Sequence, residues 1–181
     1  SLRPDIITIA KGLTSAYAPL SGSIFSNKVW KVLEQGTDEL GPIGHGWTYS
    51  AHPIGAAAGV ANLQLVDKMN LVSNAKEVGK YLLDELKNAF DSHPLVGEVR
   101  GDGMLASLEF LENKESLKFF DPAKKIGMQV SANLLKEGVI GRAMPHGDIL
   151  GLAPPLCLSK SEADIIVSSL KKSVDKVHSE I

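Results

Sequence analysis

The sequence of 181 residues predicts an α/β protein in two parts, and three observations support this prediction. Residues 5–10 are apolar and rich in β-branched side chains, which is typical of a buried strand. Apolar residues recur at helical spacing through residues 71–90, which favours a long amphipathic helix. Beyond Leu95, strand-like runs alternate with segments that carry helix-capping residues. We therefore expect part of a larger α/β domain followed by a compact α+β domain.

The first part, residues 1–70, is rich in glycine and short of strands of its own. A long irregular segment inside a compact domain is usually functional, so residues 36–53 are of particular interest. This part cannot close a core alone, and we expect it to need a chain segment that precedes it. Its expected elements are strands at 5–10 and 20–25, a helix from an Asn27 cap to about Glu34, the irregular segment at 36–53 and an alanine-rich helix at 54–66.

The second part, residues 71–181, has enough predicted strands and covering helices to form its own core. Ser159 and Glu162 have the spacing of a capping box, which predicts the start of the last helix. The other expected elements are the helix at 71–90, strands at 96–99 and 104–110 joined by a turn at 100–103, a helix from the Asp121 cap and Pro122 to about Lys136 that stops at Gly138, strands at 139–142 and 149–153, and a last helix to about Val177.

Composition excludes several classes of function. A formal net charge of -2 gives no basic surface for nucleic acid. No run approaches the roughly 20 apolar residues that cross a bilayer, so we expect no membrane partner. His45 and His52 lack a third ligand at a convincing spacing, so we expect no metal site.

The single cysteine, Cys157, excludes an internal disulfide framework and is expected in the core. A reducing, cytoplasmic compartment fits this composition. The chain begins with Ser1 and has no initiator methionine, so we expect a processed or truncated start.

Lys11 directly follows the first predicted strand and precedes Gly12. The end of such a strand carries a side chain toward the edge of the sheet where α/β folds bind ligands. A partly desolvated lysine there has an amine available to attack a carbonyl, as a Schiff base with pyridoxal phosphate requires. The alternative is a surface lysine that happens to end a strand.

The surrounding residues favour the first interpretation. Residues 4–22, PDIITIAKGLTSAYAPLSG, resemble the lysine segment of class III pyridoxal-phosphate aminotransferases. The resemblance implies a fold-type I transferase, with residues 1–70 in the large cofactor-binding domain and 71–181 as the small domain. It also implies that Lys11 bonds covalently to pyridoxal 5'-phosphate and serves as the general acid and base.

A second motif, GHGWTYSAHP at residues 44–53, is similar to the next marker of the family. The resemblance implies that the Thr48 hydroxyl and the main chain of Trp47 bind the phosphate of the cofactor held by the other subunit, and hence a homodimer. Ala51 stands where the family often has glycine. A structural loop whose Trp47 and Tyr49 side chains fill a core is the alternative.

The run RAMPHGD at residues 142–148, followed by LAPPL at 152–156, resembles a late marker of the ω-amino-acid:pyruvate branch. The resemblance implies that Arg142 binds the substrate carboxylate, and a guanidinium matches a carboxylate in a bidentate manner. The alternative is a surface arginine paired with Asp148 or another acid.

The resemblance covers nearly the whole chain but only about the last two-fifths of a full family member, so the missing N-terminal segment would be needed for activity. It implies amino-group transfer from an amine or ω-amino acid to an α-keto acid, expected to be pyruvate, in two half-reactions. An aminomutase or decarboxylase of the same fold is the second hypothesis, and a non-catalytic association module is the third.

Overall fold

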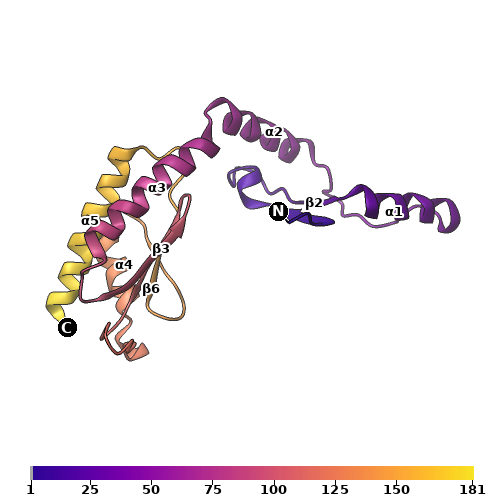
Figure 1. Cartoon of the computed structure of the whole chain (residues 1–181). Helices are drawn as coiled ribbons and strands as arrows, with labels where there is room; N and C mark the ends of the chain where they lie inside the picture. The colour runs from indigo at the N-terminus through magenta and orange to yellow at the C-terminus, as the bar shows by residue number, and fades with distance from the viewer. Residues whose placement is uncertain (1) are drawn as a thin grey trace. The chain divides into compact units, whose positions relative to one another are not determined.

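The computed structural model describes residues 2–181 (Figure 1). The chain divides into two compact units, unit 1 up to Met69 and unit 2 over Asn70–Ile181. This division falls one residue from the expected boundary. Among the described residues, no helix is both long and apolar enough to cross a membrane.

Unit 1 begins with a two-stranded antiparallel sheet, in which Ile6 pairs with Phe25 and Ile9 with Gly22. The two predicted strands are therefore present, but they are not buried: Ile6 is 53% exposed within this chain. Two strands alone have no second layer to cover their faces, which is why the expectation of burial is wrong here. The elements of unit 1 are β1 (Ile6–Ile9), the 3₁₀ turn η1 (Lys11–Leu13), β2 (Gly22–Phe25), α1 (Asn27–Leu40) and α2 (Pro53–Lys68).

The helices of unit 1 differ from the prediction at their ends. Ser26, not Asn27, occupies the N-cap of α1, and its hydroxyl donates to Asp5 Oδ1 at 2.8 Å. Helix α1 continues past Glu34 to Leu40, with Gly36 inside it. Helix α2 begins at Pro53, since proline fits the first helical position.

Unit 2 contains one antiparallel sheet of strand order β3-β4-β6-β5 and three long helices. Alternate residues of β4, Ala106, Leu108 and Phe110, are buried, whereas Ser107 and Glu109 between them are partly exposed. Helices α3 and α4 contact the sheet, and α5 contacts both helices (Figure 1). The elements are α3 (Leu71–Phe90), β3 (Val96–Asp102), β4 (Leu105–Phe110), η2 (Pro122–Lys124), α4 (Ile126–Lys136), β5 (Arg142–Ala143), β6 (Ile149–Leu152) and α5 (Lys160–Glu180).

The sequence predicted the two longest helices well. The ends of α3 agree with the expected range, and its residues Val78, Leu82 and Leu86 form a buried stripe. The capping box before α5 is present, with the Ser159 hydroxyl accepting from the N–H of Glu162. The buried apolar side chains of α3, α4, α5 and the sheet form one core.

Four local predictions in unit 2 are wrong. The strand expected at 139–142 is shifted and shorter, since only Arg142 and Ala143 form β5. Arg100 is not in the turn between β3 and β4 but in β3 itself, and only Gly103, with φ of +54°, and Met104 turn the chain. The helix expected from Pro122 is split, because Lys125 adopts a left-handed conformation with φ of +51°. Cys157 is exposed, because it lies in a turn between β6 and α5 and not in an element that packs on the core.

Candidate active site

Lys11 lies at the end of β1 and begins the η1 turn. Its φ of +51° is in the left-handed region, which is uncommon for any residue other than glycine. Ser15 and Ala16, with φ of +49° and +62°, are left-handed as well. A loop with several such residues persists only when surrounding contacts hold it, and such loops concentrate at functional sites.

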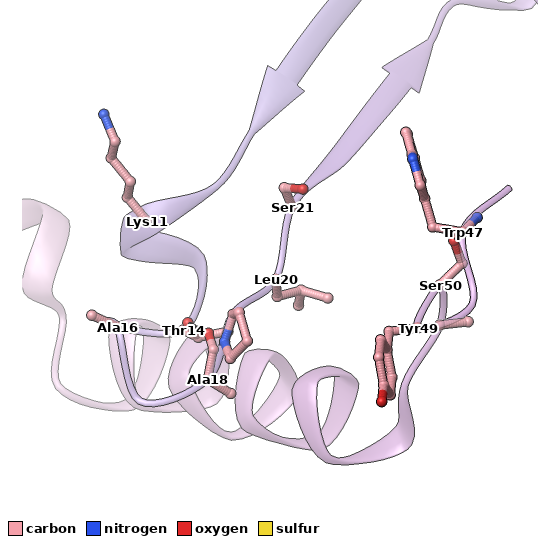
Figure 2. Close-up of a pocket in the computed structure, with 11 residues that line it drawn as sticks. Lys11, Thr14, Ala16, Ala18, Leu20, Ser21, Trp47, Tyr49 and Ser50 are labelled. Atoms are coloured by element: carbon pink, nitrogen blue, oxygen red, sulfur yellow. Dashed lines mark hydrogen bonds between the residues drawn. The ribbon is translucent and has the colours of Figure 1, made fainter.

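The side chain of Lys11 reaches an open cleft of about 790 Å³ in unit 1. Figure 2 shows Lys11 and Trp47 on opposite sides of this cleft, with both side chains pointing away from the helix beneath them. Lys11 is exposed, so the expected partial desolvation is not found within this chain, because the cleft is open. Within residues 2–181 its amine makes no ion pair or hydrogen bond. The cleft is lined by Lys11, Thr14, Ala16, Ala18, Pro19, Leu20, Ser21, Trp47, Tyr49, Ser50 and Ala51.

The second wall of the cleft comes from the turn at residues 47–51. Trp47 and Tyr49 are 74% and 80% exposed, so the alternative that they fill a core is wrong for this chain. The N–H of Trp47 donates to Ser50 Oγ at 3.1 Å, and the N–H of Ser50 donates to the Trp47 carbonyl at 2.9 Å. Ala51 has φ of +55°, which explains physically why glycine suits this position.

Thr48 lies in the same turn but does not line the cleft that contains Lys11. Its side chain is exposed, and its hydroxyl has no hydrogen-bond partner in the described part of the chain. The hydroxyl is therefore accessible to a group outside this chain.

These residues fit the chemical needs of pyridoxal phosphate. The aldehyde needs an amine that is not already engaged, and the phosphate needs hydroxyl or amide donors. Unit 1 provides the amine of Lys11 together with the hydroxyls of Ser21 and Ser50 at one cleft, and the Thr48 hydroxyl beside it.

Nothing in the sequence indicated two residues that hold the lysine loop, residues 10–21 between β1 and β2. Thr14 is 2% exposed, and its hydroxyl donates to the carbonyl of Ala18 at 2.6 Å. Asn62 of α2 bonds to the loop from 47–50 positions away. The available signal was the first polar residue within an alanine-rich helix, and no local pattern gives its partner.

Arg142 lies in unit 2, where it begins the two-residue strand β5 and is exposed. Arg142 is a surface residue, as the alternative expected, but residues 2–181 contain no ion pair between it and Asp148. Asp148 Oδ1 instead accepts from the N–H of Gly127 at 3.0 Å, in the first turn of α4. Within the described residues Arg142 makes no ion pair. It lines a groove of about 690 Å³ on unit 2 together with Arg100 and Met144.

Two solved structures that this chain resembles are transaminases. One, from a study of the directed evolution of transaminases by ancestral reconstruction, has a TM-score of 0.97 and 58% identity, over 99% of this chain and 39% of that chain. A thermostable (S)-enantioselective ω-transaminase from Thermomicrobium roseum has a TM-score of 0.89 and 36% identity, over 97% of this chain and 38% of that chain. The fold is thus that of a fold-type I, pyridoxal-phosphate-dependent transaminase.

The model of the family "Aminotransferase class-III" matches residues 1–174, so the chain belongs to the class III aminotransferases. The diaminobutyrate–2-oxoglutarate transaminase of Halomonas elongata is 56% identical over 97% of this chain and 38% of its own length. The putrescine–pyruvate aminotransferase of Pseudomonas aeruginosa is 37% identical over 96% of this chain and 36% of its own length. The chain therefore spans less than two-fifths of the length of these relatives.

Proposed function

We propose that the protein containing this chain transfers an amino group from an amine or ω-amino acid to an α-keto acid, in two half-reactions. The observation that carries this proposal is the unengaged amine of Lys11 at a cleft bounded by both family motifs. In this proposal unit 1 is the end of the large cofactor-binding domain, and unit 2 is the small domain. Pyridoxal phosphate, when bound, supplies the electron sink that stabilises negative charge on the substrate carbon.

We assign two tasks to Lys11. With the cofactor bound, its Nζ would hold the aldehyde covalently, with loss of water, in the resting enzyme. Once a substrate amine took its place, the amine of Lys11 would accept and return a proton. Both tasks need an amine without a competing partner, as found here. They also need a fixed origin for a long side chain, and the backbone of η1 provides it.

We assign the phosphate contact across a homodimer to Thr48. Its accessible hydroxyl suits a phosphate that another subunit holds. The N–H of Trp47 already donates to the Ser50 hydroxyl. This bond favours the Thr48 hydroxyl, rather than the main chain of Trp47, as the donor to the phosphate.

Arg142 is proposed to bind the carboxylate of the substrate. Its guanidinium is exposed and makes no ion pair within residues 2–181, so it is available to an anion. In the full-length enzyme Arg142→Ala should lower kcat/KM for donors with a carboxylate by roughly 10- to 100-fold, the effect of losing a charged hydrogen bond. Amine donors without a carboxylate should keep their kcat/KM, and an equal loss for both donor types would remove this role from Arg142.

Pyruvate is the acceptor that we expect, and 2-oxoglutarate is the second candidate. The relative that is 56% identical is named for 2-oxoglutarate, whereas the relative named for pyruvate is 37% identical. Initial rates of the full-length protein with each keto acid, at one fixed donor, separate the two.

The reaction class is tested with a donor that carries ¹⁵N in its amino group. We expect the label in the amino acid formed from the keto acid, and no label there for Lys11→Ala. A donor that only loses carbon dioxide would indicate a decarboxylase, and an amino group that moves within the donor would indicate an aminomutase. A protein that catalyses none of these three reactions and does not bind pyridoxal phosphate would be an association module.

A further inference from the structure

The loop that carries Lys11 lies against one face of α2. Three residues of α2 form this face: Gly55, Gly59 and Asn62. They follow one another at intervals of four and three residues and therefore lie on the same side of the helix. A Cβ on Gly55 would lie 3.3 Å from the Pro19 carbonyl, and one on Gly59 would lie 3.0 Å from a methyl of Leu20. The small residues of this face thus let the loop approach the helix closely.

Asn62 bonds to the loop with both ends of its side-chain amide. Its Nδ2 donates to the carbonyl of Gly12 at 2.9 Å and to the carbonyl of Leu13 at 3.2 Å. Its Oδ1 accepts from the Ser15 hydroxyl at 2.7 Å. Gly12 and Leu13 complete the η1 turn that Lys11 begins, so these bonds act on the residues that directly follow the lysine.

The loop needs an external restraint of this kind. Lys11 and Ser15 are both in the left-handed region, which side chains other than glycine rarely adopt. The backbone bonds within the loop range from 3.1 Å, for the Leu13 N–H to the Ala10 carbonyl, to 3.5 Å, for the Ser15 N–H to the Gly12 carbonyl. The three bonds of the Asn62 side chain, at 2.7–3.2 Å, come from outside the loop, and they tie it to a helix of sixteen residues.

We propose that Asn62 is a positioning residue for Lys11: Asn62 fixes the backbone of η1 and thereby the point from which the lysine side chain extends. Asn62 acts through the loop, since it does not line the cleft that Lys11 reaches. The proposal rests on the assignment of Lys11 in the proposed function, and it adds the residue that sets where the amine starts.

Asn74 provides a matched control. Its Nδ2 also donates to two carbonyls across the fold, those of Leu156 at 2.7 Å and Leu158 at 3.0 Å. Asn74 lies in unit 2, whereas Asn62 and the lysine loop lie in unit 1. Asn62→Ala and Asn74→Ala each remove two bonds from Nδ2 to carbonyls, and Asn62→Ala also removes the bond from the Ser15 hydroxyl. Alanine favours the helix in both variants, so a loss specific to Asn62→Ala reports on the loop.

The first readout needs no activity. In the full-length protein without cofactor, we expect the amides of Leu13 and Thr14 to exchange hydrogen roughly tenfold faster in Asn62→Ala, as the loss of about one net hydrogen bond predicts. We expect Asn74→Ala to leave these two amides unchanged. Ser15→Ala, which removes only the bond to Oδ1, should give a smaller increase.

The second readout uses the holoenzyme. For Asn62→Ala we expect kcat of the donor half-reaction to fall roughly tenfold with KM changed less than about twofold, and the pH midpoint of the bound-cofactor absorbance to move. Asn74→Ala should change neither quantity. Equal exchange rates in both variants, or an unchanged kcat and pH midpoint in Asn62→Ala, would overturn the positioning role.

The two assignments fail differently. If borohydride labels Lys11 in the parent protein but Asn62→Ala behaves like Asn74→Ala, the proposed function stands and the positioning role is overturned. If borohydride fixes no cofactor on Lys11 in the parent protein, both are overturned.

Discussion

Replacing Gly79 by alanine should destabilise unit 2, because this residue of α3 lies directly against the turn between β3 and β4. A Cβ on Gly79 would overlap the carbonyl carbon and oxygen of Gly103 and would lie 2.9 Å from its Cα. All of these atoms belong to the backbone, so no flexible side chain can move aside. The hairpin or the helix must shift, and both belong to the core of unit 2.

The size of the effect follows from two opposed terms. Overpacking in a closely packed core costs about 1–3 kcal/mol, and a rigid backbone neighbour favours the upper end. Alanine in place of glycine inside a helix returns about 1 kcal/mol. We expect a net loss of roughly 2 kcal/mol, which corresponds to about thirtyfold faster hydrogen exchange for the slowest amides of β3 and β4.

Gly36→Ala is the matched control. Gly36 also lies inside a helix, α1, but a Cβ there would have no atom within 4 Å. We therefore expect amides of α1 to exchange more slowly by a factor that corresponds to about 0.5–1 kcal/mol. If Gly79→Ala exchanges as slowly as the parent protein, the hairpin does not lie on α3 as described.

Two further predictions concern titration. Burial lowers the pKa of His93 below its ordinary 6.5 although Asp175 lies 3.3 Å away. Between the lowered pKa and 6.5 the unfolded chain binds more protons than the folded chain, so the free energy of unfolding should fall as the pH drops below about 6.5. Urea titrations at pH 7 and pH 5 should show a smaller fall in His93→Gln than in the parent protein. An equal fall in both would contradict this prediction. The hydrogen bond to Asp164 raises the pKa of Tyr81 to about 12. In an ultraviolet titration of tyrosine ionisation, Tyr81→Phe should therefore remove the step at the highest pH. Loss of a step near pH 10 instead would contradict this hydrogen bond.

Local chemistry explains what could be predicted from the sequence. The ends of α3 and the capping box before α5 depend on residues within a few positions of each other, and both predictions agree with the structure. The cleft also follows in part, since Lys11 and Trp47 come from separate motifs and line the same cleft.

Tertiary contacts explain what could not be predicted. The exposure of Cys157 depends on which elements pack over its turn, and no local pattern gives that. The left-handed residue that separates η2 from α4 is Lys125, and lysine, unlike glycine, does not indicate a left-handed conformation in a sequence. Asn62 was missed because its partners lie 47–50 residues away in the sequence.

The most direct test of the central claim asks which lysine of the full-length protein carries pyridoxal phosphate. Borohydride reduction with the cofactor present, followed by peptide mapping, should place the label on Lys11 alone, and Lys11→Ala should abolish it while Lys31→Ala, on α1, retains it. Label spread over several surface lysines, or label that survives in Lys11→Ala, would contradict the account.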